Sequence, residues 1–396
     1  MTRRPEKIGQ SNRIRVCIVA PSLDILGGQS RQAALLLAGL RDEPTLEVGF
    51  IPHNPRLPGA LRRLQTIKYV RTVVTTLCYW AMLLVRLLRY DVIHVFSAAY
   101  YSYLLSVMPA LLIAKVYRKR SILNYRSGEA EDHLKRWRLT TVPIMRLTDA
   151  IVVPSNYLVA VFARAGLQAK AISNIVEMTR FRFRNRGPLR PVFLSSRLLE
   201  PLYNMGCVLR AFACIQRRYP DASLTIAADG SLRSHLEQCA NDLGLRQTEF
   251  IGRVPFEAMP DLYDAADIYL NANDIDNTPA SILESFASGL PVVTTEAGGI
   301  PYILEHERTG LMVKCGDHEA LAASAIRLLE DPVLASRLAH NARESVRPFT
   351  LPAVSESWLS LYHELAGPKT TWKGLATEES REPVARDGDR RLLKQG

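Results

Sequence analysis

The chain has 396 residues, 47% of them hydrophobic, and its formal net charge is +11. This length allows two hydrophobic cores, because single domains usually hold ~100–200 residues. The six cysteines are scattered, with no C-x-x-C pair and no histidine spacing suited to zinc, so a zinc module is excluded and a reducing cytoplasm is expected.

The charge is divided unevenly along the chain. Residues 1–187 contain 29 Lys and Arg against 11 Asp and Glu, which gives +18, whereas the remaining residues carry −7. A basic amino-terminal half predicts an anionic partner, such as phospholipid headgroups or a lipid-linked diphosphate. Nucleic acid is the alternative, but no nucleic-acid-binding motif is recognised, so none is expected.

The amino-terminal half alternates buried strands with helices. Residues 1–13 are polar and basic, without a signal or anchor pattern, and are expected to be disordered. Apolar runs predict strands, and a Gly-Gly turn precedes a helical pattern. The strands are expected at Ile14–Ser22, Asp91–Ala98 and Ala150–Ser155, and the helix at Gly27–Leu40. Such runs favour a parallel sheet covered on both faces.

Two basic apolar segments lie within this half. The first, Leu61–Tyr90, contains a thirteen-residue apolar run from Val73 to Val85, and the second is Tyr101–Arg120. The run is too short to span a bilayer, which takes ~20 residues, but a basic apolar helix can lie in the membrane interface. The alternative is that both helices pack on the sheet as ordinary core.

The second half repeats the strand–helix scheme. Strands are predicted at Pro191–Ser196, Ser223–Gly230, Ile268–Ala272 and Pro291–Thr295. The sequence therefore predicts an α/β fold of two doubly wound domains, with the ligand between them at the carboxyl ends of the strands. Irregular, arginine-rich chain near residues 174–189 predicts a linker. The expected division is 14–178, a linker at 179–189, 190–348, a helix at 349–367 that crosses back, and a disordered tail at 368–396.

The most informative motif is DNTPASILESFASGLPVVTTEAGGIPYIL, Asp276 to Leu304. Thr278 is expected to cap a short helix that Pro279 begins and Gly289 ends. The N–H groups at such a helix start can bind an anion. Glu284 lies in a largely apolar helix, where a carboxylate needs a partner. The alternative for Asp276 is a simple turn former.

This motif resembles that of the family-4 glycosyltransferases, which are retaining enzymes of the GT-B fold. Their signature is Glu, seven residues, Glu, followed by a Gly-x-Pro-Val-Val segment and a Gly-Gly turn. The resemblance extends over most of residues 190–345 and implies two Rossmann-like domains facing across an interdomain cleft. The amino-terminal domain would then bind the acceptor, and the carboxy-terminal domain the nucleotide sugar.

The resemblance also implies roles for individual residues. Glu284 would accept hydrogen bonds from the ribose, Asp276 would face the sugar, and Arg197 would bind the diphosphate. Arg126 and His133 are the candidates near the reacting sugar and the acceptor. The remaining residues expected to bind the donor are Gly27, Gly28, Arg253, Asn277, Thr278 and Ala280.

The chain departs from the family pattern at three places. Asp276 stands where the family has Glu, Met205-Gly206 stands where Lys-Gly is usual, and Arg126 stands where a His is frequent. The missing lysine removes a cation from the leaving diphosphate, which can cost several kcal/mol of transition-state stabilisation. Arg253 is a candidate to replace it.

The implied reaction is transfer of a sugar, with retention, from a nucleoside-diphosphate sugar to an acceptor hydroxyl. UDP-sugar is the expected donor, and a glycan or lipid-linked molecule of the cell envelope is the expected acceptor. No cofactor or metal is expected, although Asp274-Ile275-Asp276 spells D-x-D. The expected location is cytoplasmic, with peripheral contact to an anionic membrane. Two alternatives are a weakly active binding or scaffold subunit and a nucleotide-sugar epimerase.

Overall fold

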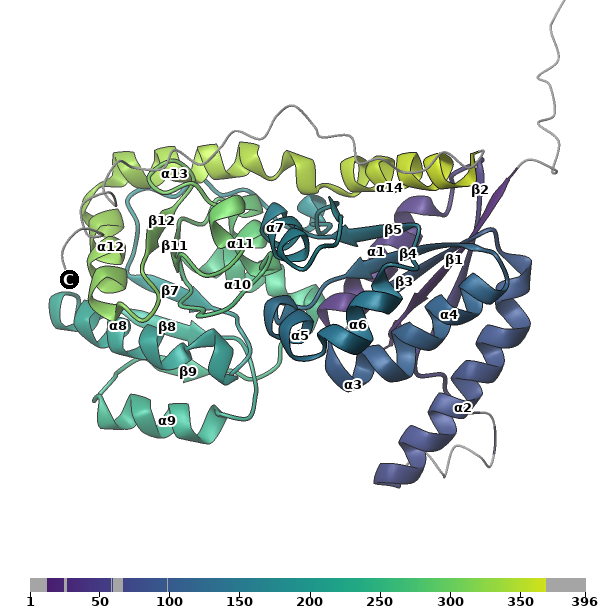
Figure 1. Cartoon of the computed structure of the whole chain (residues 1–396). Helices are drawn as coiled ribbons and strands as arrows, with labels where there is room; N and C mark the ends of the chain where they lie inside the picture. Colours follow the sequence, from purple (N-terminus) through teal and green to yellow (C-terminus); the bar gives the residue numbers. More distant parts are fainter. Residues whose placement is uncertain (1–12, 25–26, 58, 60–66, 98, 368–396) are drawn as a thin grey trace, which may run out of the picture.

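The computed structural model describes residues 13–24, 27–57, 59, 67–97 and 99–367. The tail expected to be disordered, 368–396, lies outside the described residues, as does all but Arg13 of the amino-terminal segment. Two six-stranded parallel sheets lie side by side, each with helices packed against it (Figure 1). The predicted α/β architecture of two doubly wound sheets is therefore confirmed.

The amino-terminal sheet has the strand order β2-β1-β3-β4-β5-β6. Its strands are β1 (Ile14–Ala20), β2 (Leu46–Pro52), β3 (Val92–Ser97), β4 (Arg120–Tyr125), β5 (Ala150–Val153) and β6 (Lys170–Ala171). The four central strands, β1, β3, β4 and β5, are mostly buried, as parallel strands covered on both faces require, whereas the edge strands β2 and β6 are only half-buried. The helices are α1 (Gly28–Leu40), α2 (Lys68–Arg86), α3 (Tyr100–Ser102), α4 (Met108–Val116), α5 (Ala130–Arg136), α6 (Arg138–Met145) and α7 (Asn156–Arg164).

The carboxy-terminal sheet has the order β12-β11-β10-β7-β8-β9. Its strands are β7 (Val192–Ser195), β8 (Ser223–Ile226), β9 (Thr248–Phe250), β10 (Ile268–Leu270), β11 (Val292–Thr295) and β12 (Leu311–Val313). Its helices are α8 (Met205–Arg218), α9 (Arg233–Asp242), α10 (Met259–Ala265), α11 (Ala280–Ala287), α12 (His318–Glu330) and α13 (Pro332–Ser345). The strand order reverses between β1 and β3 in the first sheet and between β7 and β10 in the second, and α/β folds place ligands at such points.

The last described helix, α14 (Leu351–Ala366), connects the two halves. Figure 1 shows it running on from α13 toward the amino-terminal sheet. Trp358 and Tyr362 are fully buried in a core that they share with Val16 and Ile18 of β1. The ring of His94, on β3, stacks on Trp358 with 4.2 Å between centroids, and its Nδ1 lies 2.7 Å from the Tyr362 hydroxyl. The end of the described chain thus completes the amino-terminal core.

Helix α2 is longer than the apolar run that predicted it. Residues Tyr69–Arg89 form a 21-residue helix that is long and apolar enough, by length and composition, to cross a membrane. It is the one such helix among the described residues, and 17% of its most apolar window is buried. The expectation that this segment is too short to span is therefore wrong, because the helix continues beyond the run at both ends.

Candidate functional site

The predicted catalytic pair lies together at the carboxyl end of the second sheet. Arg197 follows β7, and Asp276 lies in the loop between β10 and α11. Nη2 of Arg197 is 2.6 Å from Oδ2 of Asp276, and its guanidinium lies 4.3 Å from the ring centroid of Tyr203. Burial lowers the pKa of Arg197, but Asp276 together with Tyr203, Tyr269 and Tyr263 outweighs burial and leaves this pKa raised.

Several buried polar atoms around this pair have no hydrogen-bond partner among the described residues. They are Nε of Arg197, Oδ1 of Asn273 and Nδ2 of Asn277. Asn273 nevertheless donates to Asp276 through Nδ2, and Asn277 accepts a 2.6 Å hydrogen bond from Ser155 through Oδ1. Because buried polar groups are usually paired, such a concentration of unpaired donors and acceptors is typical of a ligand site.

The short helix α11 begins differently from the prediction. Pro279 precedes its first residue, Ala280, and no side chain caps it. Thr278, predicted as the cap, instead directs its hydroxyl to the carbonyl of Pro154 at 3.4 Å. That hydrogen bond and the one from Ser155 join the loop to the chain after β5, so the segment binds the other domain rather than its own helix.

Glu284 lies in the middle of α11 and has the partner that its position requires. Oε2 of Glu284 accepts a 2.9 Å hydrogen bond from the hydroxyl of Tyr263, a fully buried residue of α10. Burial raises the pKa of Glu284, and this outweighs the effects of Tyr263 and of the positive charges of Arg197 and Arg31. Since Oε1 has no partner among the described residues, Glu284 retains an acceptor for a ligand hydroxyl.

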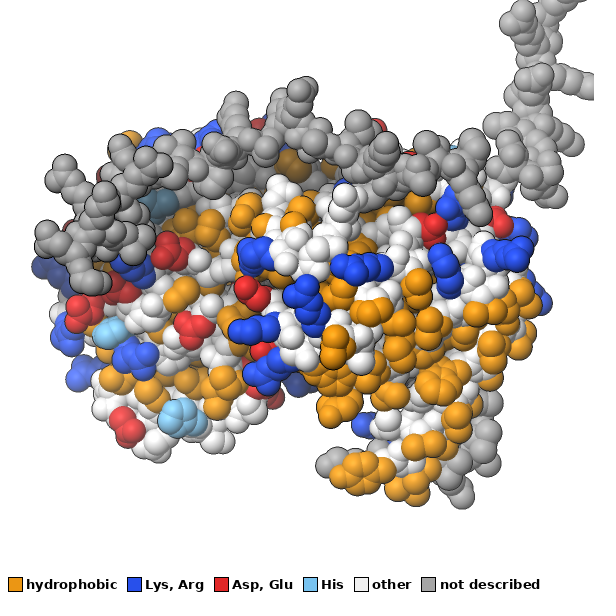
Figure 2. All heavy atoms as spheres, in the orientation of Figure 1, with side chains coloured by type: hydrophobic (Ala, Val, Ile, Leu, Met, Phe, Trp, Pro, Cys, Tyr) orange, Lys and Arg blue, Asp and Glu red, His pale blue; other side chains and the backbone are white. Residues whose placement is uncertain are grey.

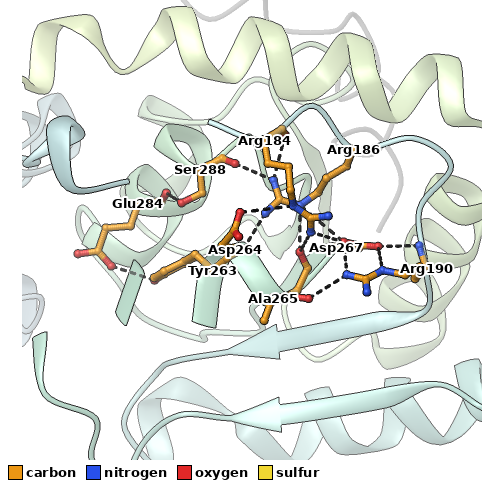
Figure 3. Close-up of polar contacts among 10 residues, drawn as sticks. Arg184, Arg186, Arg190, Tyr263, Asp264, Ala265, Asp267, Glu284 and Ser288 are labelled. Carbon is orange, nitrogen blue, oxygen red and sulfur yellow. Dashed lines mark hydrogen bonds and ion pairs between the residues drawn. The ribbon is translucent and has the colours of Figure 1, made fainter. Parts of the chain in front are cut away.

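A cluster of arginines from the linker contacts the backbone of α10 and of the residues that follow α10 and α11 (Figure 3). The side chain of Arg186 is 2% exposed and donates to the carbonyls of Tyr263 at 2.7 Å, Ser288 at 2.6 Å and Ala266 at 2.9 Å. Burial lowers the pKa of Arg186 to about 10. Arg186 therefore fixes the backbone of the residue that holds Glu284 and of the residue that follows α11.

Asp267 is the carboxylate of this cluster. Its side chain is 2% exposed and accepts from Arg184 at 2.6 Å and from Arg190 at 2.9 Å. Burial raises the pKa of Asp267, but the hydrogen bonds from Arg190 and Arg184 outweigh burial and lower it. The crowding of arginines in the linker was the signal for this cluster. In the sequence, that crowding predicted only a linker.

Arg31 is a further site residue that the sequence analysis missed. It lies on α1, directly after the glycine turn, and pairs with Glu177 of the linker. Its guanidinium lies 3.8 Å from the ring centroid of Phe256, and its charge acts on Glu284 across the domain contact. Burial, with the nearby charge of Arg180, lowers the pKa of Arg31. Its place after Gly27-Gly28 was the available signal.

The predicted glycines lie at the start of α1. Gly27 precedes the helix with extended backbone, at φ 176°, and Gly28 is its first residue. A Cβ added at either would meet nothing within 4 Å among the described residues. Neither backbone conformation nor packing in the described structure therefore demands glycine at these two positions, which leaves close approach of a ligand as a reason for them.

Arg126 lies where the two domains meet, next to the loop that contains Asp276. It follows β4, donates to Asn124 at 2.9 Å and also donates to Asn174, whose Nδ2 donates to the carbonyl of Thr278 at 3.1 Å. Burial lowers the pKa of Arg126 to about 10. Arg126 is thus connected to the loop of Asp276 through one intervening side chain.

Two predicted residues do not join this group. His133 is fully buried in α5, where Nδ1 lies 2.9 Å from the Tyr125 hydroxyl, and burial lowers its pKa to about 4. The expectation of an acceptor-side histidine is therefore wrong, because the ring lies in the hydrophobic core. Arg253 is exposed in the loop after β9 and contacts neither Arg197 nor Glu284.

The position of the missing lysine and the D-x-D sequence are both explained by local packing. Met205, at the start of α8, is 2% exposed and belongs to the core of the second domain. Asp274 accepts hydrogen bonds from Asn204 at 3.0 and 3.1 Å, whereas Asp276 pairs with Arg197. Within the described residues, no group of three or more His, Cys, Asp or Glu could hold a metal ion.

Comparison with known proteins gives similarity in both sequence and structure. Over 149 residues the chain is 32% identical to the lipopolysaccharide core biosynthesis glycosyltransferase LpsE of Rhizobium meliloti, which covers 36% of this chain and 42% of the relative. It thus spans less than half the length of that curated relative. Over 273 residues it is 25% identical to a Campylobacter jejuni enzyme named GalNAc-alpha-(1->4)-GalNAc-alpha-(1->3)-diNAcBac-PP-undecaprenol alpha-1,4-N-acetyl-D-galactosaminyltransferase, covering 68% of this chain and 75% of the relative.

Among solved structures, Anabaena HepE in complex with UDP and glucose superposes with a TM-score of 0.70 at 17% identity. The match covers 89% of this chain and all of that chain, and it supports the two-domain GT-B fold. The family model described as glycosyl transferases group 1 matches residues 177–345, the segment that contains Arg197, Asp276 and Glu284. Through that segment, the chain is similar to the glycosyl transferases of group 1.

Proposed function

We propose that this protein is a retaining glycosyltransferase that takes its sugar from a nucleoside diphosphate, with a UDP-sugar as the donor. The observation that carries this proposal is the set of unpaired buried polar atoms around the Arg197–Asp276 pair, within the segment that matches the family. The binding of UDP and glucose by a protein of the same fold supports the choice of donor.

In the proposed mechanism, each residue binds the ligand through an atom that has no hydrogen-bond partner among the described residues. Glu284 accepts a hydrogen bond from the ribose, and Arg197 offers Nε to the diphosphate while its other end stays with Asp276. The acceptor oxygen forms a bond to the anomeric carbon as the bond to the diphosphate breaks, and the acceptor proton passes to the diphosphate. Arg197 is preorganised to stabilise the charge that grows on that leaving group.

Arg31 is our candidate for the cation that Met205 does not supply. It follows the glycine turn, its charge already acts on Glu284, and its buried Nε has no hydrogen-bond partner among the described residues. An arginine can hold two phosphate oxygens at once, so it can replace a lysine contact from another element. No metal is required in this scheme, because two guanidinium groups neutralise the diphosphate.

The donor is tested with the purified full chain and a set of UDP-, GDP- and ADP-sugars. We expect one nucleotide series to raise the melting temperature, since ligands that bind only the folded state stabilise it. Its sugar conjugate should release nucleotide with an acceptor and in the presence of EDTA. Glu284→Gln should lose both responses. Binding without any release would instead favour the non-catalytic binding subunit, which the loss of the lysine also favours.

The acceptor is proposed to bind in a cavity of about 680 Å³ in the amino-terminal domain. It lies at the carboxyl ends of β1 and β2, the same edge of the sheet from which the chain leads to Gly27. All of its lining residues except Leu105 are polar in type: Ser22, Asp24, His53, Asn54, Arg56, Arg71, Thr72, Thr75, Thr76, Ser102, Leu105 and Ser106. Hydroxyl, amide and guanidinium groups suit a glycan joined to a phosphate.

We further propose that this acceptor is lipid-linked and belongs to cell-envelope glycan or glycolipid synthesis. The undecaprenyl diphosphate in the name of the Campylobacter jejuni relative supports this class. A cytoplasmic protein with such an acceptor would work at the inner face of the membrane. Thr76→Trp should fill the cavity and raise the KM for acceptor while leaving UDP affinity unchanged. Thr140→Trp, on exposed α6, is the control.

A further inference from the structure

Two neighbouring helical segments of the amino-terminal domain expose a continuous set of large apolar side chains. We call this set the apolar face. Figure 2 shows hydrophobic side chains gathered over α2, α3 and α4 on one side of the molecule. The apolar face consists of Val73, Leu77, Trp80, Leu84 and Leu88 from α2 and the turn after it, and of Tyr101, Leu105, Leu112 and Val116 from α3 to α4.

The spacing along α2 separates the apolar face from the stripe that packs on the sheet. Tyr79, Leu83 and Leu87 recur every four residues and are buried in the core of the amino-terminal domain. The members of the apolar face recur at intervals of four, three, four and four residues, so they form a second stripe on another side of the helix. Val73 is 59% exposed and Leu77 57% exposed. A soluble helix usually has polar residues on that side.

The two segments are joined along their length by hydrogen bonds. Nε1 of Trp80 donates to the carbonyl of Leu105 at 3.0 Å, and the hydroxyl of Tyr117 donates to the carbonyl of Leu84 at 2.9 Å. Lys119 donates to the carbonyl of Leu88 at 2.9 Å. The apolar face is therefore one fixed surface rather than two independent helices.

Positive charge surrounds the carboxyl ends of both helices. Residues 67–120 contain eight Lys and Arg and a single acidic residue, Asp91, which pairs with Arg15. Arg89 and Arg118 are exposed near Leu88 and Val116, at the ends that Tyr117 and Lys119 hold together. An apolar surface with a cationic border and an exposed tryptophan and tyrosine matches the interface of an anionic bilayer.

We infer that the apolar face docks on the surface of an anionic lipid bilayer, with α2 lying in the interface. A crossing orientation would remove Tyr79, Leu83 and Leu87 from the core that they share with the sheet, and it would break the 2.7 Å hydrogen bond from Tyr79 to the carbonyl of Ser106. Docking keeps all of these contacts. Leu105 belongs both to the apolar face and to the cavity, so docking brings that cavity to the lipid surface.

The test measures co-sedimentation of the full chain with vesicles of phosphatidylcholine alone and of phosphatidylcholine mixed with phosphatidylglycerol. We expect binding to the mixed vesicles and weakening with salt. Combining Leu77→Ser with Leu84→Ser should lower the binding constant about tenfold or more. Val116→Ser should weaken binding, whereas Val333→Ser should not, although these valines are 77% and 78% exposed. Arg89→Glu with Arg118→Glu should abolish the preference for anionic vesicles.

Each other outcome would overturn the inference. Equal binding to both vesicle types by the wild type would mean that charge takes no part. Bound protein that resists extraction by alkaline carbonate would show that α2 inserts across the bilayer. If the wild type binds no vesicles but is a dimer that Leu77→Ser with Leu84→Ser converts to a monomer, the face is a contact between two copies. All variants must keep the wild-type melting temperature, which is expected because the changed side chains are exposed.

Discussion

The two halves of the molecule differ in which groups they bury and which they expose. The carboxy-terminal half buries charged groups in paired clusters around Asp276 and Asp267, whereas the amino-terminal half exposes an apolar face and buries the rings of His94 and His133. Buried ion pairs hold side chains in a fixed geometry, although removing their charges from water is unfavourable. An exposed apolar surface is unfavourable in water, and binding a partner can cover it. This difference fits binding of a small ligand in a fixed geometry by the carboxy-terminal half and contact with an extended surface by the amino-terminal half.

The largest expected effect tests how far the carboxy-terminal half depends on its buried charges. Arg186→Met should lower the free energy of unfolding by ~3–5 kcal/mol, because it leaves Asp267 with fewer partners and removes one donor from each of four backbone carbonyls. Arg182→Met is the control, since Arg182 is exposed in the same linker. Urea unfolding of both variants measures the difference. Equal stability of the two would mean that the cluster is not what holds α10 and α11.

The second prediction separates the reaction from stability. Arg197→Ala should lower the rate of sugar transfer by ~10²–10³-fold, the range found when one preorganised donor to a growing negative charge is removed. Arg197→Lys should recover part of that loss, because it keeps the charge but loses the second nitrogen. Initial rates with saturating donor and acceptor measure both. Equal losses in kcat for the two variants would show that geometry alone matters, and no loss would remove Arg197 from the mechanism.

In the carboxy-terminal half, the sequence indicated which loop and helix meet at the end of the sheet, whereas the roles of their residues stay predictions. Asp276 and Glu284 belong to a compact motif in which chain distance nearly fixes spatial distance, whereas Arg197 follows another strand of the same sheet, 79 residues before Asp276. Arg31 could not be predicted, because its nearness to Glu284 depends on how two domains meet. Nor could Tyr263, whose hydroxyl reaches Glu284 from another helix.

The amino-terminal half was predicted less well, for physical reasons. Strands β2, β4 and β6 were missed here, against β9 and β12 in the carboxy-terminal half. Strand β2 is half-buried with mixed polarity, and β4 begins inside a basic stretch. His133 follows a polar loop, and only the packing of α5 shows that its ring is buried. A membrane-facing helix and a core helix have the same composition, so exposure had to come from the structure.

The third prediction concerns acid and sharpens the contrast between the halves. Burial lowers the pKa of His53 and of His133 from 6.5 to about 4, and it lowers the pKa of His94 well below 6.5. The unfolded chain therefore binds more protons than the folded chain between pH 6.5 and pH 4, and stability falls as the pH falls through that window. All three rings lie in the amino-terminal half, so that half should unfold first.

Tryptophan fluorescence can follow this transition, because the tryptophans that the structure describes, Trp80, Trp137 and Trp358, all pack on the amino-terminal domain. Replacing His133 by Gln should shift the acid midpoint downward, because a group whose pKa burial lowers to about 4 would no longer take up a proton on unfolding in acid. His235→Gln, in the second half, is the control. A fluorescence midpoint that coincides with loss of UDP binding would mean that the halves unfold together.

The smallest effect on stability is expected at the glycine turn, and it bears on how the halves cooperate. Gly27→Ala should change the free energy of unfolding by less than about 0.5 kcal/mol, as expected for a substitution without steric conflict. A Cβ there meets nothing within 4 Å among the described residues, and the backbone is extended. Donor affinity should nevertheless fall, because a methyl group would keep the backbone away from the diphosphate. Titration with UDP measures this, and unchanged affinity would mean that the amino-terminal half contributes charge, through Arg31, rather than backbone contact.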